Sequence, residues 1–199
     1  DTGTTSTTVR ATLNAASDLE VTVTLLTSGT ATSPIDYAIP STIIIPAGTL
    51  SASVTFFAIM DTLDEPDETV TIDINTVTNG SENGTQTQTV TILDDDLPPT
   101  VTLSVGSNSI NEKAGTTSTT VRATLNVASG LEVTVTLAKA GRAIDVSDYT
   151  LVSTILIPAG TRSASITLAA IHDSLNENDE RVTIDINTVT NGSENGTQT

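Results

Sequence analysis

Acidic side chains are concentrated in a few short segments of this sequence. The segment Asp61–Glu68 reads DTLDEPDE, and Asp94–Asp96 is a run of three aspartates. A third segment, Asp173–Glu180, reads DSLNENDE, and Asp36 and Asp148 each precede a tyrosine. Carboxylates brought together without counter-charge raise one another's pKa. Hard oxygen ligands of this kind suit calcium, which takes about six to eight of them, better than magnesium, which requires stricter geometry.

Spacing alone leaves two interpretations of these acids open. One is a calcium site, and the other is a set of solvated loops that only aid solubility. The pattern is not that of an EF-hand, because no D-x-D-x-D-G loop followed by a spaced glutamate is present.

Catalytic chemistry finds little support in the sequence. His172 is the single histidine, so the first half of the chain has no base for a nucleophile–histidine pair. We interpret His172 as a bystander beside Asp173, with a metal ligand as the alternative, since Met60 occupies the matching place in the first half. Paired carboxylates can hydrolyse glycosides, but two Tyr, two Phe and no Trp provide no aromatic platform for a sugar. We therefore predict that the protein is not an enzyme.

The overall charge excludes further classes of partner. The 199 residues include 24 acidic and 7 basic ones, for a formal net charge of −17. Such a surface repels nucleic acid and anionic lipid and attracts cations. No apolar run is long enough to span a bilayer, and no cysteine is available for disulfides or thiolate metal sites. We predict no nucleic-acid partner and no membrane insertion.

An internal repeat organises the elements that must position these acids. The segments Gly3–Asn14 and Gly115–Asn126 are identical, as are Val70–Thr87 and Val182–Thr199, at a constant offset of 112 positions. Residues 88–112 occur once. We interpret the chain as two copies of one unit, the first without its opening strand and the second without its closing strand. Each copy would then have an unpaired sheet edge.

The sequence of each copy predicts a series of short strands. Alternating apolar and polar residues, rich in Val, Ile and Thr, predict strands over residues 87–93, 100–105, 119–125, 131–137, 154–157, 163–168 and 181–186. Pro-Ala-Gly and Asn-Gly sequences between them are typical turns. The sequence predicts an all-β fold with sandwiches at 1–96 and 100–199, joined by a stiff linker at 97–99 that contains Pro98 and Pro99. The triplets that begin at Asn79, Asn83, Asn191 and Asn195 are interpreted as turns, with N-glycosylation as the alternative.

The ordered set of these motifs resembles the Calx-beta domain over essentially the whole chain. The residues that carry the resemblance are Asp36-Tyr37, Pro46-Ala47-Gly48, Asp61, Glu65, Glu68 and Thr89–Asp96 in the first copy, and Asp148-Tyr149, Pro158-Ala159-Gly160, Asp173, Glu177 and Glu180 in the second. The resemblance implies tandem immunoglobulin-like sandwiches of about seven antiparallel strands each, with Ca²⁺ bound in loops at one end.

Carried over position by position, the resemblance implies two ligand sets. They are Asp36, Asp61, Glu65, Glu68, Asp94, Asp95 and Asp96 in the first copy, and Glu112, Asp148, Asp173, Glu177 and Glu180 in the second. Met60 and His172 stand where strong calcium-binding members have a further aspartate. We therefore expect an affinity in the weak extracellular class, at about 10⁻⁴–10⁻³ M.

The predicted function is that of a calcium-binding structural repeat in an extracellular fibre, adhesin or matrix protein, where calcium stiffens loops and interdomain junctions. The expected location is extracellular, at the cell surface or in a matrix. The expected partners are neighbouring repeats or identical chains, joined by strand completion into filaments, with an adhesion ligand that the sequence does not identify. The alternatives are a regulatory calcium sensor and a carbohydrate-binding surface module.

Overall fold

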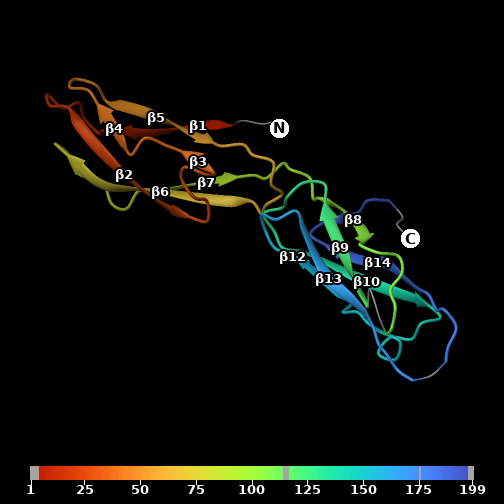
Figure 1. The fold of residues 1–199 in the computed structure, drawn as a ribbon. Helices are drawn as coiled ribbons and strands as arrows, with labels where there is room; N and C mark the ends of the chain where they lie inside the picture. The colour runs from red at the N-terminus through yellow and green to blue at the C-terminus, as the bar shows by residue number, and fades with distance from the viewer. Residues whose placement is uncertain (1–4, 114–116, 175, 197–199) are drawn as a thin grey trace. The chain divides into compact units, whose positions relative to one another are not determined.

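The computed structural model describes residues 5–113, 117–174 and 176–196. The chain forms two compact units. Unit one contains residues 1–61 and 66–95, and unit two contains residues 62–65 and 96–199. Every regular element within the described ranges is a β-strand (Figure 1), which confirms the predicted all-β class. Within the described residues, the structure contains no helix that is long and apolar enough to cross a membrane.

Unit one consists of two antiparallel sheets. The first sheet has the order β1-β5-β3 and the second β4-β2-β6-β7. The strands are β1 (Ser6–Thr12), β2 (Val21–Gly29), β3 (Tyr37–Ala38), β4 (Thr42–Ile45), β5 (Ser51–Ala58), β6 (Glu68–Thr78) and β7 (Thr87–Ile92).

Unit two repeats most of this arrangement: it adds β8 and β15, and its described residues contain no counterpart of β7. Its sheets have the orders β12-β10-β14 and β11-β13-β9-β8-β15. Pairing is antiparallel except between β15 and β8, which run parallel. The strands are β8 (Thr100–Val105), β9 (Ser118–Leu125), β10 (Val133–Gly141), β11 (Tyr149–Thr150), β12 (Thr154–Ile157), β13 (Ser163–Ala170), β14 (Val182–Thr190) and β15 (Ser193–Glu194).

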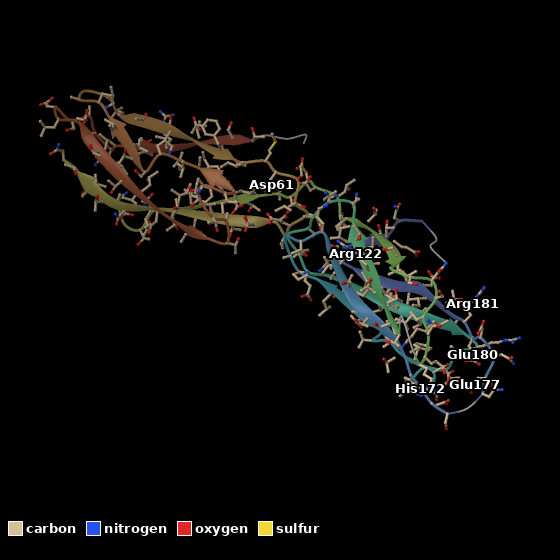
Figure 2. All side chains as sticks on the ribbon, viewed as in Figure 1. Asp61, Arg122, His172, Glu177, Glu180 and Arg181 are labelled. Carbon is tan, nitrogen blue, oxygen red and sulfur yellow. The ribbon has the colours of Figure 1, made fainter. Side chains whose placement is uncertain are left out.

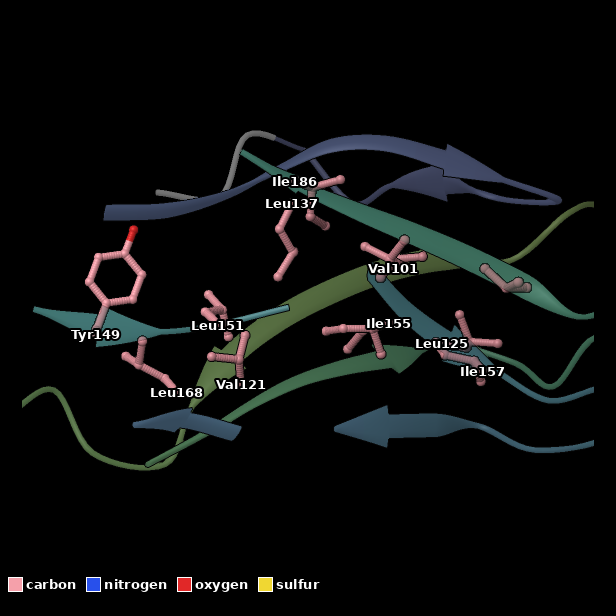
Figure 3. Packing of buried hydrophobic residues seen from close by; sticks show 13 residues of the cluster. Val101, Val121, Leu125, Leu137, Tyr149, Leu151, Ile155, Ile157, Leu168 and Ile186 are labelled. Carbon is pink, nitrogen blue, oxygen red and sulfur yellow. The ribbon is translucent and has the colours of Figure 1, made fainter. Parts of the chain in front are cut away.

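Period-two alternation explains why these segments are strands. In β9 buried and exposed positions alternate, so that Val121, Ala123 and Leu125 point inward. They meet residues of the opposite sheet, such as Val135 and Ile155, in one aliphatic core (Figure 3). Branched aliphatic side chains fill this space because the chain has few aromatic residues.

The predicted strands match the structure most closely where apolar residues alternate without interruption. β8 and β12 have the predicted bounds, whereas β10 begins two residues later than predicted and extends to Gly141. Both β2 and β10 change register in mid-strand, between Thr24 and Leu25 and between Thr136 and Leu137. In β10 the shift falls at the predicted end, Leu137, and the strand continues beyond it to Gly141.

Short strands without an apolar run were not predicted. β3 and β11 each contain two residues and extend the sheet beside β5 and β13. Tyr37 of β3 is buried and its ring stacks on Phe56, with centroids 5.3 Å apart and planes inclined by 12°. Tyr37 therefore anchors to the core the loop of residues 30–36, which carries Asp36 and is called the aspartate loop of unit one.

Candidate metal centre

In unit two, the aspartate loop is residues 142–148, which connect β10 to β11. Hydrogen bonds fix its conformation. The N–H of Asp148 donates to the carbonyl of Ile144 at 2.9 Å, and the Asp148 carboxylate accepts a hydrogen bond from the N–H of Ile144. The carbonyl of Asp148 accepts from the N–H of Ile171 at 2.8 Å. Because Ile171 lies two residues before Asp173, this bond brings Asp148 beside the start of the acidic segment Asp173–Glu180.

The other end of that acidic segment meets the same loop. The N–H groups of Arg142 and Ala143 donate to the carbonyl of Arg181 at 2.9 and 3.3 Å. This close approach requires glycine at position 141, where φ is +132° and a Cβ atom would lie 2.1 Å from that carbonyl oxygen. Glu180, which precedes Arg181, is thereby placed beside the Asp148 loop.

The carboxylates of unit two interact at this end of the sandwich. A hydrogen bond with the Asp148 side chain raises the pKa of Glu180, and partial desolvation and repulsion from Asp148 and Glu177 raise it further. Desolvation also raises the pKa of Glu177, followed by repulsion from Asp173, Asp148 and Glu112. Figure 2 shows Glu177 and Glu180 at the same end of the unit. All five predicted ligands of unit two thus belong to one electrostatic cluster.

Arg142 provides partial counter-charge in unit two. Arg142 lowers the pKa of Glu180, and Arg181 follows Glu180 in the chain. The corresponding residues of unit one are Thr30 and Thr69, so unit one has no such compensation. Sequence reasoning did not use this difference, although comparison of the two copies makes it visible.

Asp145, a further acidic residue of the same loop, pairs with a lysine. It forms an ion pair with Lys139, whose ammonium group also donates to the carbonyl of Leu151 at 2.9 Å. Burial is the main reason why the pKa of Tyr149 is raised, and the charge of Asp145 adds to it. This pair lies beside the cluster and supports the base of the loop.

In unit one the aspartate loop has the same construction. The N–H of Asp36 donates to the carbonyl of Thr32 at 2.8 Å, and the Asp36 carboxylate accepts from the N–H of Thr32 at 2.6 Å. The carbonyl of Asp36 accepts from the N–H of Ile59 at 2.9 Å, which places Asp36 beside the chain that leads to Asp61. Asp61 is exposed at this end of the unit (Figure 2).

The triple aspartate reaches the same end through β6 and β7. The N–H groups of Thr30 and Ala31 donate to the carbonyl of Thr69, next to Glu68. Glu68 is paired with Ile92 at the end of β7, and two residues later Asp94 begins the triple aspartate. Asp36, Glu68 and Asp94 are therefore linked through backbone pairing, with Asp95 directly after them. Asp96, which the predicted set also includes, belongs to unit two.

Asp67, which the predicted ligand set omits, contacts the triple aspartate. Its Oδ1 atom accepts a hydrogen bond from the N–H of Asp94 at 3.0 Å, so it orients the first residue of the triple aspartate. The matching residue in unit two, Asp179, is also an aspartate. This agreement between the copies was the signal that could have identified it.

Glu65, a predicted ligand of the first copy, lies in the segment 62–65 that is part of unit two. Its side chain covers Gly130, where a Cβ atom would lie 2.4 Å from the Glu65 Cγ atom. The neighbouring Asp64 is buried, and its carboxylate accepts a hydrogen bond from the hydroxyl of Ser129 at 3.3 Å. The assignment of Glu65 as a calcium ligand stays a prediction.

The oxygen-rich donor set fits calcium by its chemistry. No group of three or more His, Asp or Glu side chains within residues 5–113, 117–174 and 176–196 is tight enough to form a preassembled metal cluster. What the structure shows is a concentration of negative charge, with raised pKa values at Glu177 and Glu180. The exposed His172 lies at the same end of unit two as Glu177 (Figure 2). The individual ligand assignments stay a prediction.

Comparison with known proteins identifies the family of both units. The Calx-beta domain matches the sequence twice, over residues 1–96 and 94–199. No protein of curated function matches the sequence. Two similar solved structures are CBD12 from CALX1.2 and the calcium binding domain CBD12 of CALX1.1. Each has 18% identity and a TM-score of 0.42, with 94% of this chain and 75% of the other covered. The class 5 fimbriae chaperone CfaA follows with 12% identity, a TM-score of 0.32, and coverage of 90% of this chain and 91% of that one.

Proposed function

Because this chain belongs to the Calx-beta domain family, we propose that each unit binds calcium at the end that carries its aspartate loop. The observation that carries the proposal is the cluster of Glu112, Asp148, Asp173, Glu177 and Glu180. A hydrogen bond with Asp148 raises the pKa of Glu180, desolvation raises the pKa of Glu177, and repulsion from neighbouring carboxylates raises both further. A bound calcium ion supplies the positive charge that relieves this repulsion.

The chain's own residues prepare this end of each unit for a cation. The hydrogen bonds from Thr32 and Ile144 orient the carboxylates of Asp36 and Asp148. Asp67 orients the backbone at Asp94 in the same way. Most of these oxygen atoms are held on loops, and Glu68 stands at the first position of β6, which suits the flexible coordination of calcium.

We further propose that the protein is a non-catalytic structural repeat of an extracellular fibre, adhesin or matrix protein. Near-identical copies, Thr-rich aliphatic strands and a net charge of −17 support this role. Neutralising the acids would stiffen the loops and restrict the hinge between units. Small-angle scattering and thermal unfolding with and without a chelator test it, and curves that coincide would contradict a mechanical role for the metal.

Calcium titration calorimetry on paired variants tests the site. Asp36→Asn and Asp148→Asn keep a side-chain oxygen for the loop hydrogen bond and remove one charge. Each is expected to weaken binding in its own unit at least about tenfold. Glu20→Gln and Glu132→Gln, at matching positions outside the clusters, serve as controls. Equal affinities for all four variants would refute the assignment.

A regulatory calcium sensor is the rival within the same family. Weak binding near 10⁻⁴–10⁻³ M supports the structural role, and micromolar binding supports the sensor. Met60 and His172, at the positions of the missing aspartates, favour the weaker class. A carbohydrate-binding module would require glycan binding, for which the sequence provides no aromatic platform.

A further inference from the structure

Val146, at the tip of the aspartate loop of unit two, has a backbone conformation that valine rarely adopts. Its φ angle is +73°, in the left-handed region. A β-branched side chain crowds the backbone there, so this conformation costs free energy. The other non-glycine residues with positive φ in the described ranges are Asn79 and Asn191, and asparagine tolerates this region. Among the described residues, Val146 is therefore the strained exception.

Burial of its own side chain does not hold Val146 in this conformation. The residue is 78% exposed, so the valine gains little from contact with the core. A strained backbone persists only where the surrounding structure fixes it. The restraint must therefore come from the residues on either side of Val146.

On one side of the valine, Lys139 fixes Asp145. Lys139 lies on β10 with only 16% of its side chain exposed, and its ammonium group pairs with the Asp145 carboxylate. The same ammonium group donates to the carbonyl of Leu151 at 2.9 Å. Lysine is rarely buried to this extent without a charged partner. Lys139 thus connects the strand before the loop, the loop itself and the segment that follows it.

On the other side, the loop is tied to the core through Tyr149. The N–H of Val146 donates to the carbonyl of Tyr149 at 2.8 Å, and the tyrosine is buried. The N–H groups of Ser147 and Asp148 both donate to the carbonyl of Ile144, at 3.2 and 2.9 Å. The chain therefore reverses within a few residues, and a left-handed residue is a common way to close so tight a turn.

Unit one restrains the same loop without charged residues at these positions. Thr27 and Ser33 stand where unit two has the lysine and the aspartate of the ion pair. Pro34 stands at the position of the valine, and its ring by itself fixes φ at about −65°. The N–H of Asp36 still donates to the carbonyl of Thr32 at 2.8 Å. Both units thus restrain the tip of the loop, unit one by proline and unit two by the ion pair.

We propose that Lys139 is a positioning residue for the candidate metal centre of unit two. Its ion pair with Asp145 and its bond to Leu151 hold the aspartate loop closed before any cation binds. Val146 is kept in the left-handed conformation, and Asp148 is kept at the place where a cation would meet it. The proposal rests on calcium binding by unit two and adds the residue that preorganises that site.

The strain at Val146 makes the ion pair necessary. Without the pair, relief of the strain favours an open loop. A loop that is closed in only a fraction of the molecules binds with an apparent affinity reduced by that fraction. A residue that tolerates the left-handed region should therefore make the ion pair dispensable. This expectation separates a positioning role of Lys139 from a purely electrostatic one, because the effect of charge does not depend on the residue at position 146.

Hydrogen exchange of the full chain in chelator tests the restraint without calcium. Lys139→Thr combined with Asp145→Ser introduces the residues of unit one and leaves the net charge unchanged. Exchange in the peptide of residues 142–151 should become at least about tenfold faster. The loop of residues 30–36 is the internal control. Arg122→Thr, which removes an exposed side-chain hydrogen bond of β9, is the control variant. Equal protection in the double variant and the unmodified chain would overturn the proposal.

Calcium titration calorimetry tests the positioning role. The double variant should bind calcium in unit two at least about fivefold more weakly, with no change in unit one. Adding Val146→Asn should restore the affinity to within about twofold, because asparagine tolerates positive φ. Adding Val146→Thr is the matched control, since threonine is polar but β-branched and should give no recovery. Equal effects of asparagine and threonine would show that Lys139 does not act through the conformation of the loop.

The outcomes distinguish this proposal from the proposed function. Faster exchange in chelator together with an unchanged calcium affinity would refute the positioning role. Absence of calcium binding by the unmodified chain would refute the proposed function, and the exchange experiment would still decide whether Lys139 restrains the loop.

Discussion

Leu13 and Leu125 stand at equivalent positions of the two copies. They allow a direct test of how burial in the tertiary structure sets the contribution of a leucine side chain to the free energy of unfolding. Leu125 is 2% exposed and lies opposite Val101 of β8. Leu13 has the same local sequence and the same kind of hydrogen bond to its β5-side neighbour, since its N–H donates to the carbonyl of Leu50 at 2.8 Å. It is only half-buried, and within the described residues β1 pairs with β5 alone.

Truncation of each leucine to alanine should therefore have different consequences. Leu125→Ala removes fully buried methyl groups and leaves a cavity, which should lower the free energy of unfolding of unit two by about 3–4 kcal/mol. Leu13→Ala removes side-chain atoms that already contact solvent, so unit one should lose only about 1–2 kcal/mol. At about 1.4 kcal/mol per tenfold change, the opening constants should rise by about 100- to 1000-fold and about 10-fold.

Native-state hydrogen exchange with mass spectrometry can measure the two effects in the same chain. Peptides from β2 and β10 report on their own units, because VTVTLLTSG and VTVTLAKAG differ in sequence. Leu125→Ala should accelerate exchange in β10, and Leu13→Ala should accelerate exchange in β2 to a smaller extent. Equal effects of the two substitutions would refute the inference that the difference in burial sets the contribution of each leucine to stability.

Three further predictions follow from the candidate metal centre. Arg142→Thr, which gives unit two the residue of unit one, should tighten calcium binding in unit two about threefold at low salt, measured by calorimetry; an unchanged affinity would show that this arginine does not oppose the cation. The pKa values of Glu177 and Glu180 are raised above their ordinary value of 4.5, so the folded form holds these protons more tightly than the unfolded form. In chelator the free energy of unfolding of unit two should therefore fall as pH rises from about 4.5 through the raised values, and calcium should remove the fall; stability that rises over this interval in chelator would contradict the cluster. Gly29→Ala would place a Cβ atom 2.1 Å from the carbonyl oxygen of Thr69 at φ +135°, whereas Gly48→Ala, at φ +76°, meets no atom within 4 Å. Gly29→Ala should lower the free energy of unfolding of unit one by at least about 2 kcal/mol and weaken its calcium binding. Gly48→Ala should lower the free energy of unfolding by about 1 kcal/mol and leave calcium binding unchanged. Hydrogen exchange in β2 measures the stability, and calorimetry measures the binding.

Much of the candidate centre follows from local sequence. The Asp-Tyr pairs, the Pro-Ala-Gly turns and the acidic runs all lie between alternating strands, so their placement in loops requires no tertiary information. What each acidic residue contacts required the tertiary structure. Glu68 begins β6 and pairs with Ile92 of β7, and the side chain of Glu65 lies against Gly130.

The sequence by itself determined the all-β class, the repeat and most strand positions, because period-two alternation of branched side chains is a local property. Only the tertiary structure decided how completely each identical segment is covered and whether it forms a strand. Ser193–Glu194 is a strand beside β8, and the identical Ser81–Glu82 is not. The physical reason is that hydrogen bonding and burial at a sheet edge depend on the neighbouring strand, and that neighbour is encoded far away in the chain.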